Sequence, residues 1–197
     1  NPKVLIGFSD ITALANGIYK ETGLITFHGP VGSTLDDAYS IEQLENVVMH
    51  PKKKLLIENV KLEDKALLSN PEFERYSITS GEAKGKLVGG SLTLINALIG
   101  TPHEIDFTNT IVCIEGPTFK KAAGIMIGVC KGCDKPPTPE SFTLKDVILD
   151  RIQPLGIPSA YGMSFGHVDN NFTIPIGIEA IFDADNLTLK LLEKAVR

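Results

Sequence analysis

The strongest constraint on the fold comes from the first 27 residues, which alternate between strand and helix patterns. The apolar run 4–6 predicts a buried strand, residues 11–22 have apolar side chains at helical spacing, and the run 24–27 predicts a second strand. Gly23 follows the helical segment where a left-handed C-cap is expected. A strand–helix–strand unit of this length is typical of α/β proteins. The inward helix face is expected to carry Ile11, Leu14, Ala15 and Ile18.

The rest of the chain continues this alternation. Apolar runs that predict strands occur at 54–60, 111–114, 125–129, 157–160, 172–176 and 178–182, and the run 87–92 precedes a helix pattern. Helical spacing occurs at 40–49, 62–68, 92–100 and 143–155, the last capped by Ser141 or Thr143. The tail, 186–195, fits either a short helix or a closing strand with a turn. Glycine and polar residues gather near Ser80–Lys86, which predicts two domains, 1–80 and 81–197.

Composition argues against several classes of function. Nineteen basic and 24 acidic residues give a net charge of −5, which disfavours nucleic-acid binding and anionic membrane surfaces. We expect no membrane span, because no apolar run approaches about 18 residues. No signal peptide is apparent, and three cysteines are too few for a disulfide framework. These features predict a reducing, cytoplasmic setting.

The Cys130-Lys-Gly-Cys133 segment invites a metal or redox interpretation. Tetrahedral zinc needs four ligands, and the sequence has no second pair of this spacing. The segment follows a buried-strand pattern and leads into a proline-rich loop. We therefore interpret the two cysteines as packing at a strand end, and we expect neither a metal nor another cofactor.

Three residues suit the roles of a hydrolytic triad. Ser9 lies on a strand-to-helix turn, which exposes a hydroxyl and points backbone N–H groups at one place. Glu115 directly follows the strand 111–114, and His167 lies in a segment rich in turn residues. A serine nucleophile needs a base, and the base needs an anion that orients it. The alternative for Ser9 is a helix N-cap.

Several stretches resemble the LD-carboxypeptidase family of serine peptidases, in the order in which the family has them. These stretches are Gly7-Phe-Ser-Asp-Ile-Thr-Ala-Leu14, Thr22-Gly-Leu-Ile-Thr-Phe-His-Gly-Pro30, Gly85-Lys-Leu-Val-Gly-Gly-Ser-Leu-Thr-Leu94, Gly162-Met-Ser-Phe-Gly-His167 and Ile174-Pro-Ile-Gly177. The resemblance implies hydrolysis of an L,D-peptide bond, typically the release of terminal D-alanine from a murein tetrapeptide in cell-wall recycling. A related branch hydrolyses the antibiotic microcin C and confers immunity.

The resemblance also assigns roles to residues. It implies that Ser9 is the nucleophile, His167 the base, Glu115 the orienting acid, and the N–H of Asp10 an oxyanion donor. Substrate binding would fall on the turn Gly89-Gly90-Ser91. The implied architecture is an N-terminal α/β domain, here without its first part, and a C-terminal swivelling β/α domain. The implied assembly is a homodimer.

The sequence departs from the family pattern in three places. The family has a segment with a Gly-Gly-Tyr-Gly-like motif before the serine strand, whereas this sequence begins in that strand. A Pro-Tyr-Arg-containing arm usually follows the glutamate, and here Glu115 is followed by Gly116-Pro117. Ser91 stands where asparagine is common. The sequence is therefore either part of a longer protein or a shortened form that would be a poor enzyme.

Three alternatives for function remain open at this stage. The chain is a murein tetrapeptide carboxypeptidase, a microcin C-type peptide–nucleotide hydrolase, or a binding protein that keeps the fold without the chemistry. The microcin branch would need an aromatic platform for a base, for which Tyr161 and Phe165 are the candidates. The residue before the scissile bond, lysine or diaminopimelate, is also open.

Overall fold

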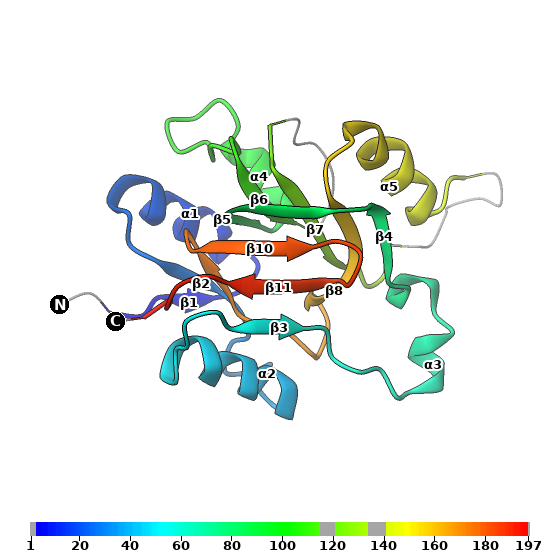
Figure 1. The fold of residues 1–197 in the computed structure, drawn as a ribbon, viewed down its shortest axis with the longest axis horizontal. Helices are drawn as coiled ribbons and strands as arrows, with labels where there is room; N and C mark the ends of the chain where they lie inside the picture. The colour runs from blue at the N-terminus through cyan, green and yellow to red at the C-terminus, as the bar shows by residue number, and fades with distance from the viewer. Residues whose placement is uncertain (1–2, 115–120, 134–140, 197) are drawn as a thin grey trace.

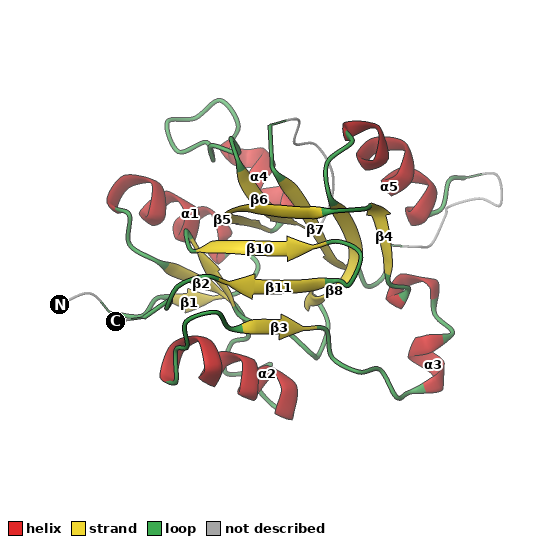
Figure 2. Cartoon of the chain, viewed as in Figure 1, coloured by secondary structure: helices red, strands yellow, loops and turns green. Residues whose placement is uncertain are grey.

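The computed structural model describes residues 3–114, 121–133 and 141–196 of the chain. Its strands form a three-stranded sheet and an eight-stranded mixed sheet (Figures 1 and 2). The strand order is β1-β2-β9 in the smaller sheet and β3-β11-β10-β5-β6-β7-β8-β4 in the larger one. The α/β class predicted from the sequence is confirmed.

Most elements follow the predicted alternation, but the strand Tyr76–Thr79 was not predicted. The strands are β1 (Ile6–Gly7), β2 (Thr26–His28), β3 (Leu56–Glu58), β4 (Tyr76–Thr79), β5 (Glu82–Gly90), β6 (Thr110–Ile114), β7 (Gly124–Val129), β8 (Ser159–Gly166), β9 (Ile174–Ile176), β10 (Glu179–Asp183) and β11 (Thr188–Leu191). The α-helices are α1 (Ile11–Thr22), α2 (Ala38–Leu44), α3 (Lys65–Leu68), α4 (Leu92–Leu98) and α5 (Leu144–Ile152). Short π- and 3₁₀-helical segments are η1 (Glu45–Met49), η2 (Pro71–Phe73) and η3 (Gln153–Leu155).

The N-terminal strand–helix–strand unit forms as predicted. β1 and β2 pair in parallel, and α1 connects them. Gly23 caps α1 in the left-handed conformation, with φ of 69°. The buried face of α1 differs from the prediction, however, because Leu14 is exposed and the fully buried side chains are Thr12, Ala15 and Asn16.

The larger sheet separates two hydrophobic clusters, because successive side chains of a strand point to opposite faces. Leu87 and Ile111 belong to the cluster that also contains Phe27 and Ile174 of the smaller sheet. Val88 and Val112 belong to the second cluster, which includes Ile95 of α4 and Ile148 and Ile152 of α5. The smaller sheet and the helices α4 and α5 therefore cover different faces of the large sheet.

One local prediction is corrected, and two alternatives left open by the sequence are decided. The turn-rich segment before His167 belongs to β8, which continues through Ser164 to Gly166. The tail forms a strand, β11, which closes the large sheet beside β10. Thr143, rather than Ser141, caps α5 and forms a capping box with Asp146.

Strand pairing links the two halves of the chain. β3 and β4 precede residue 80 but pair with β11 and β8 of the large sheet. β9 comes from the second half and pairs with β2 of the small sheet. The division into domains 1–80 and 81–197 stays a prediction. None of the helices in residues 3–114, 121–133 and 141–196 has the length and apolar character needed to cross a membrane.

Candidate active site

Ser9 occupies a strained turn between β1 and α1. Its φ is 52°, in the left-handed region that residues with a side chain rarely adopt. The N-cap of α1 is Asp10, and no side chain makes the capping hydrogen bond. The N-cap alternative for Ser9 is therefore wrong. The Ser9 hydroxyl has no hydrogen-bond partner within the described part of the chain, so it is available for another role.

His28, at the end of β2, supports this turn. The backbone N–H of Ser9 donates to Nε2 of His28 at 3.2 Å. Burial, with a smaller contribution from the nearby charge of His167, lowers the pKa of His28 to about 4. The imidazole is therefore neutral at neutral pH, and its unprotonated Nε2 accepts the Ser9 hydrogen bond.

His167 follows β8 and lies beside the serine turn. The ring of Phe8, the residue before Ser9, meets the His167 ring edge-on at 4.8 Å between centroids. The Phe8 ring also lies 5.4 Å from His28. One aromatic side chain of the serine turn thus contacts both histidines, and the structure brings the predicted nucleophile and base into one region.

The predicted substrate turn lies at one edge of the large sheet, where β5 ends at Gly90. β5, β6, β7 and β8 are parallel neighbours, so their carboxyl ends lie at the same edge. Gly90 pairs with Ile114, the last residue of β6, and Val129 pairs with Gly166. Glu115, the predicted orienting acid, lies outside the described residues.

Two buried polar residues of α1 join the serine turn to the end of β5. Asn16 donates from Nδ2 to the Gly89 carbonyl at 2.8 Å and accepts the Gly89 N–H at 3.1 Å. Thr12 donates from Oγ1 to the Ser9 carbonyl at 2.6 Å and accepts the Ser91 N–H at 2.9 Å. The turn that carries the nucleophile and the predicted substrate turn are thus bonded to the same helix.

The close approach of β5 to α1 and β6 requires glycine at both positions of the Gly89-Gly90 pair. Gly89 and Gly90 have φ of 123° and 132°. A Cβ on Gly89 would collide with the Cys113 carbonyl oxygen, and one on Gly90 would collide with Thr12 Oγ1. Only glycine therefore allows β5 to lie this close to both α1 and β6.

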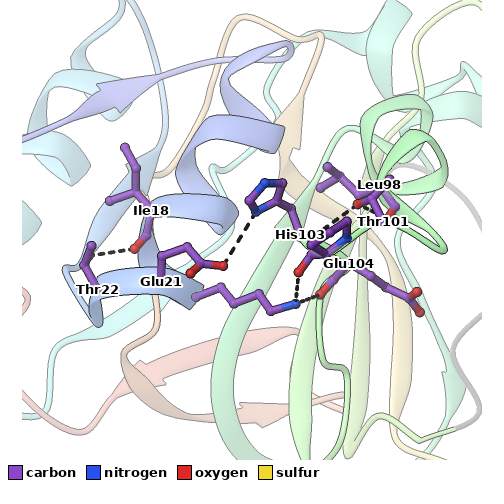
Figure 3. Close-up of polar contacts among 9 residues, drawn as sticks. Ile18, Glu21, Thr22, Leu98, Thr101, His103 and Glu104 are labelled. Atoms are coloured by element: carbon purple, nitrogen blue, oxygen red, sulfur yellow. Dashed lines mark hydrogen bonds and ion pairs between the residues drawn. The ribbon is translucent and has the colours of Figure 1, made fainter.

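A second contact holds the other end of α1. Lys20 Nζ donates to the carbonyl oxygens of Pro102 and Glu104 at 2.6 Å and 2.9 Å. The Glu21 carboxylate lies 3.6 Å from Nδ1 of His103, with both side chains exposed (Figure 3). The helix behind the nucleophile is thus fixed at its N-terminus by buried bonds and at its C-terminus by surface bonds.

His28, Thr12 and Asn16 were not among the site residues predicted from the sequence. All three lie in or beside stretches that carry the family resemblance. A usable signal for Thr12 and Asn16 was their spacing of four, which puts two polar side chains next to each other on one helix face. His28 carried no distinguishing signal, because its role depends on where β2 pairs with β1.

Two other predictions from the sequence change. Tyr161 and Phe165 are buried in the core, 1% and 2% exposed, so neither forms a platform for a base. Cys130 and Cys133 are joined by a disulfide, so the interpretation of the pair as simple packing at a strand end is wrong. Among the described residues, no three His, Cys, Asp or Glu side chains are grouped as a metal site would need.

Comparison with known proteins gives matches along the whole chain. Residues 84–118 and 116–182 match the LD-carboxypeptidase C-terminal domain, and residues 1–29 match the N-terminal domain. The "Probable murein peptide carboxypeptidase" of Bacillus subtilis is 31% identical over 95% of this chain and 62% of its own length. The microcin C7 self-immunity protein MccF of Escherichia coli is 27% identical over 98% of this chain and 67% of its own length.

Solved structures give the same result at the level of the fold. An MccF-like protein of Bacillus anthracis superposes with a TM-score of 0.74 at 26% identity, over 98% of this chain and 68% of that one. A muramoyltetrapeptide carboxypeptidase of Oxalobacter formigenes also gives 0.74, at 20% identity, over 96% and 67%. The chain spans somewhat less than two thirds of the Bacillus subtilis relative.

Proposed function

The chain belongs to the LD-carboxypeptidase family, and we propose that the protein is a serine peptidase that releases D-alanine from a murein tetrapeptide. The observation that carries this proposal is the strained Ser9 turn, next to the His167-bearing end of β8. The name of the Bacillus subtilis relative, which refers to murein peptides, supports the substrate class.

The proposed reaction begins with attack on the scissile carbonyl. Ser9 Oγ forms the new bond to carbon, and His167 takes the hydroxyl proton. Glu115 holds the His167 ring in the required tautomer and stabilises its charged form. The pair of electrons from the carbonyl moves to its oxygen, which becomes the oxyanion of a tetrahedral intermediate.

The N–H of Asp10 is the proposed donor to that oxyanion. Within the described residues this N–H has no acceptor, and it lies at the N-terminus of α1, a helix of 12 residues. The partial positive charge of a helix N-terminus adds to the stabilisation. The N–H of Ser9 is not available for this role, because it is bonded to His28.

The second half of the reaction restores the enzyme. The intermediate collapses when His167 returns its proton to the leaving nitrogen of D-alanine, and an acyl-Ser9 ester remains. His167 then takes a proton from water, whose oxygen attacks the ester, and Ser9 is released with its hydroxyl. We propose a homodimeric, cytoplasmic enzyme that needs no metal or other cofactor for these steps.

The decisive experiment is D-alanine release from a purified murein tetrapeptide. Wild-type protein should release D-alanine, and Ser9→Ala should reduce release to background while its circular dichroism and melting temperature stay those of wild type. Undiminished release by the Ser9→Ala variant would exclude Ser9 as the nucleophile. A chelator should have no effect.

The second candidate is hydrolysis of a microcin C-type peptide–nucleotide, which the MccF similarity favours. The burial of Tyr161 and Phe165 weakens it, because neither ring is available to stack on a base. The two are separated by comparing turnover of the tetrapeptide with that of an aminoacyl sulfamoyl adenosine. A third candidate, binding without catalysis, predicts calorimetric binding of the tetrapeptide with no D-alanine release.

A further inference from the structure

Arg75, just before β4, has a cationic side chain that lines a small cavity. It has no carboxylate partner among residues 3–114, 121–133 and 141–196. Its Nη1 donates to the Val60 carbonyl at 2.6 Å, and its Nη2 lies 3.4 Å from Ser164 Oγ. Its Nε is buried and has no acceptor within the described part of the chain. An arginine presents five N–H donors in a planar fork, so this side chain keeps unused donors in a partly dehydrated place.

The cavity beside Arg75 has a volume of about 50 Å³. A cavity needs only about 10–15 Å³ to hold one water molecule, so this one has room for a small polar group such as a carboxylate. Val60, Phe73, Val129 and Val168 give it apolar walls. Its polar lining comes from Arg75, Lys131, Ser164, Asp169 and Asn170.

The charges around the cavity favour an anion. Arg75 and Lys131 are cationic, and Asp169 is the acidic residue of the lining. Asp169 is exposed and forms no ion pair with Arg75 among the described residues. Burial lowers the pKa of Arg75, which means that its charge is held at a cost that a bound anion would offset.

Two residues of strand β8, Gly162 and Ser164, lie against Arg75. Gly162 has φ of 87°, and a Cβ there would meet the Glu74 carbonyl oxygen and, at 2.9 Å, Cγ of Arg75. The Ser164 hydroxyl accepts the Val60 N–H at 3.0 Å. This bond holds Val60, whose carbonyl accepts from Arg75. Backbone groups thus position the arginine, and no carboxylate of the described residues pairs with it.

The cavity also lies next to the candidate active site. Ser164 is three residues before His167 on the same chain segment, which corresponds to roughly 10 Å of extended backbone. Val168, Asp169 and Asn170 of the lining are the three residues that follow His167. A peptide held at Ser9 and His167 can therefore reach the cavity with a long side chain.

We propose that the Arg75 cavity binds a free carboxylate at the end of the substrate side chain next to the scissile bond. This inference rests on the proposed peptidase function. A carboxylate matches the arginine fork in shape and charge, and Lys131 adds attraction at the edge of the cavity. The site therefore favours an acidic side chain over a basic one before the terminal D-alanine.

The test uses two peptides that end in D-alanine and differ only at the end of the preceding side chain. One peptide carries a free carboxylate there, and the other carries the carboxamide. Wild-type protein should bind the carboxylate peptide about 10- to 100-fold more tightly, the range of a charge-assisted hydrogen bond. The KM for D-alanine release should be lower for the carboxylate peptide, and the kcat of the two peptides should be similar.

Variants assign this preference to Arg75. Arg75→Gln should remove the discrimination, and Arg75→Lys should restore part of it by returning the charge without the fork. The control is Arg151→Gln, because Arg151 is exposed and paired with its neighbour Asp150. Melting temperatures of all variants separate a loss of recognition from a loss of fold.

The outcomes for the subsite and for the peptidase function are distinguishable. Equal KM values for both peptides, with D-alanine released from each, would overturn the subsite and leave the peptidase function intact. Arg75-dependent carboxylate binding with no D-alanine release would support the subsite and overturn the peptidase function. Discrimination that persists in a folded Arg75→Gln protein would place the carboxylate elsewhere.

Discussion

The backbone N–H of Ser9 is bonded to Nε2 of His28, so the conformation of the predicted nucleophile depends on a buried neutral imidazole. Protonation of His28 would convert Nε2 from an acceptor into a donor that faces another donor. The serine turn is therefore bonded to a side chain whose protonation would break that hydrogen bond.

His28 predicts a specific dependence of stability on pH. Its pKa is lowered from 6.5 to about 4 in the folded protein, so the unfolded chain binds the proton more readily. The stabilisation is full above pH 6.5 and is lost as pH falls from 6.5 toward 4, by about 3 kcal/mol in total. Urea unfolding between pH 4 and pH 7.5 measures this slope.

His28→Gln is the matched variant for that slope, because glutamine keeps an acceptor but does not titrate. The difference in unfolding free energy between wild type and variant should be constant above pH 6.5 and shrink as pH falls from 6.5 to 4. A pH-independent difference would show that His28 has an ordinary pKa in the folded protein. The carboxylates with lowered pKa, such as Asp37, lose their contribution at lower pH and affect both proteins equally.

Asn16 predicts a large loss of stability on truncation. Its side chain satisfies both the N–H and the carbonyl of Gly89, and both groups are buried. Asn16→Ala leaves them without partners, which should cost about 2–4 kcal/mol in unfolding free energy. The control is Asn96→Ala on α4, where the asparagine is exposed and the change should be within about 0.5 kcal/mol. Equal effects at the two positions would refute the buried role of Asn16.

The extent of sequence-based prediction differs between local and long-range features. The first strand–helix–strand unit and the cap at Gly23 were predictable because they depend on nearby residues. The burial of Thr12 and Asn16 was not, since it requires β5, more than 70 residues later, to lie against α1. The position of Ser164 in a strand was also not predictable. It depends on Asn59 and Val60, more than 100 residues earlier, which hydrogen-bond to the Ser164 backbone and hydroxyl.

Two glycine substitutions should have opposite effects. Gly17 lies within α1, and a Cβ there would meet nothing within 4 Å. Gly17→Ala should therefore raise the unfolding free energy by about 0.5–1 kcal/mol, because alanine favours the helix. Gly90→Ala should lower it, since the new Cβ would meet Thr12 Oγ1 at a backbone conformation that strains alanine.

Urea unfolding at constant pH measures both glycine variants. Gly90→Ala should also reduce D-alanine release, because Thr12 bonds the Ser9 carbonyl and the Ser91 N–H. Gly17→Ala should leave turnover unchanged. Stabilisation by both alanines would show that β5 and α1 do not approach each other as described.

The disulfide between Cys130 and Cys133 predicts a countable change in thiols. The bond spans a sequence separation of three, and Cys113 is the free cysteine of the described residues. Unfolded, non-reduced protein should show one reactive thiol, and reduced protein should show three, the number of cysteines in the sequence. Because the closed loop is short, reduction should lower the unfolding free energy by at most about 2 kcal/mol.

The double variant Cys130→Ser, Cys133→Ser is the control for that measurement. Its stability should match that of the reduced wild type and should not respond to a reductant. Cys113 is buried in β6, and burial raises the pKa of its thiol, so the folded protein should keep it unreactive in both cases. Three reactive thiols in unfolded, non-reduced protein would show that the pair is not bonded, and the strand-end packing interpretation would then stand.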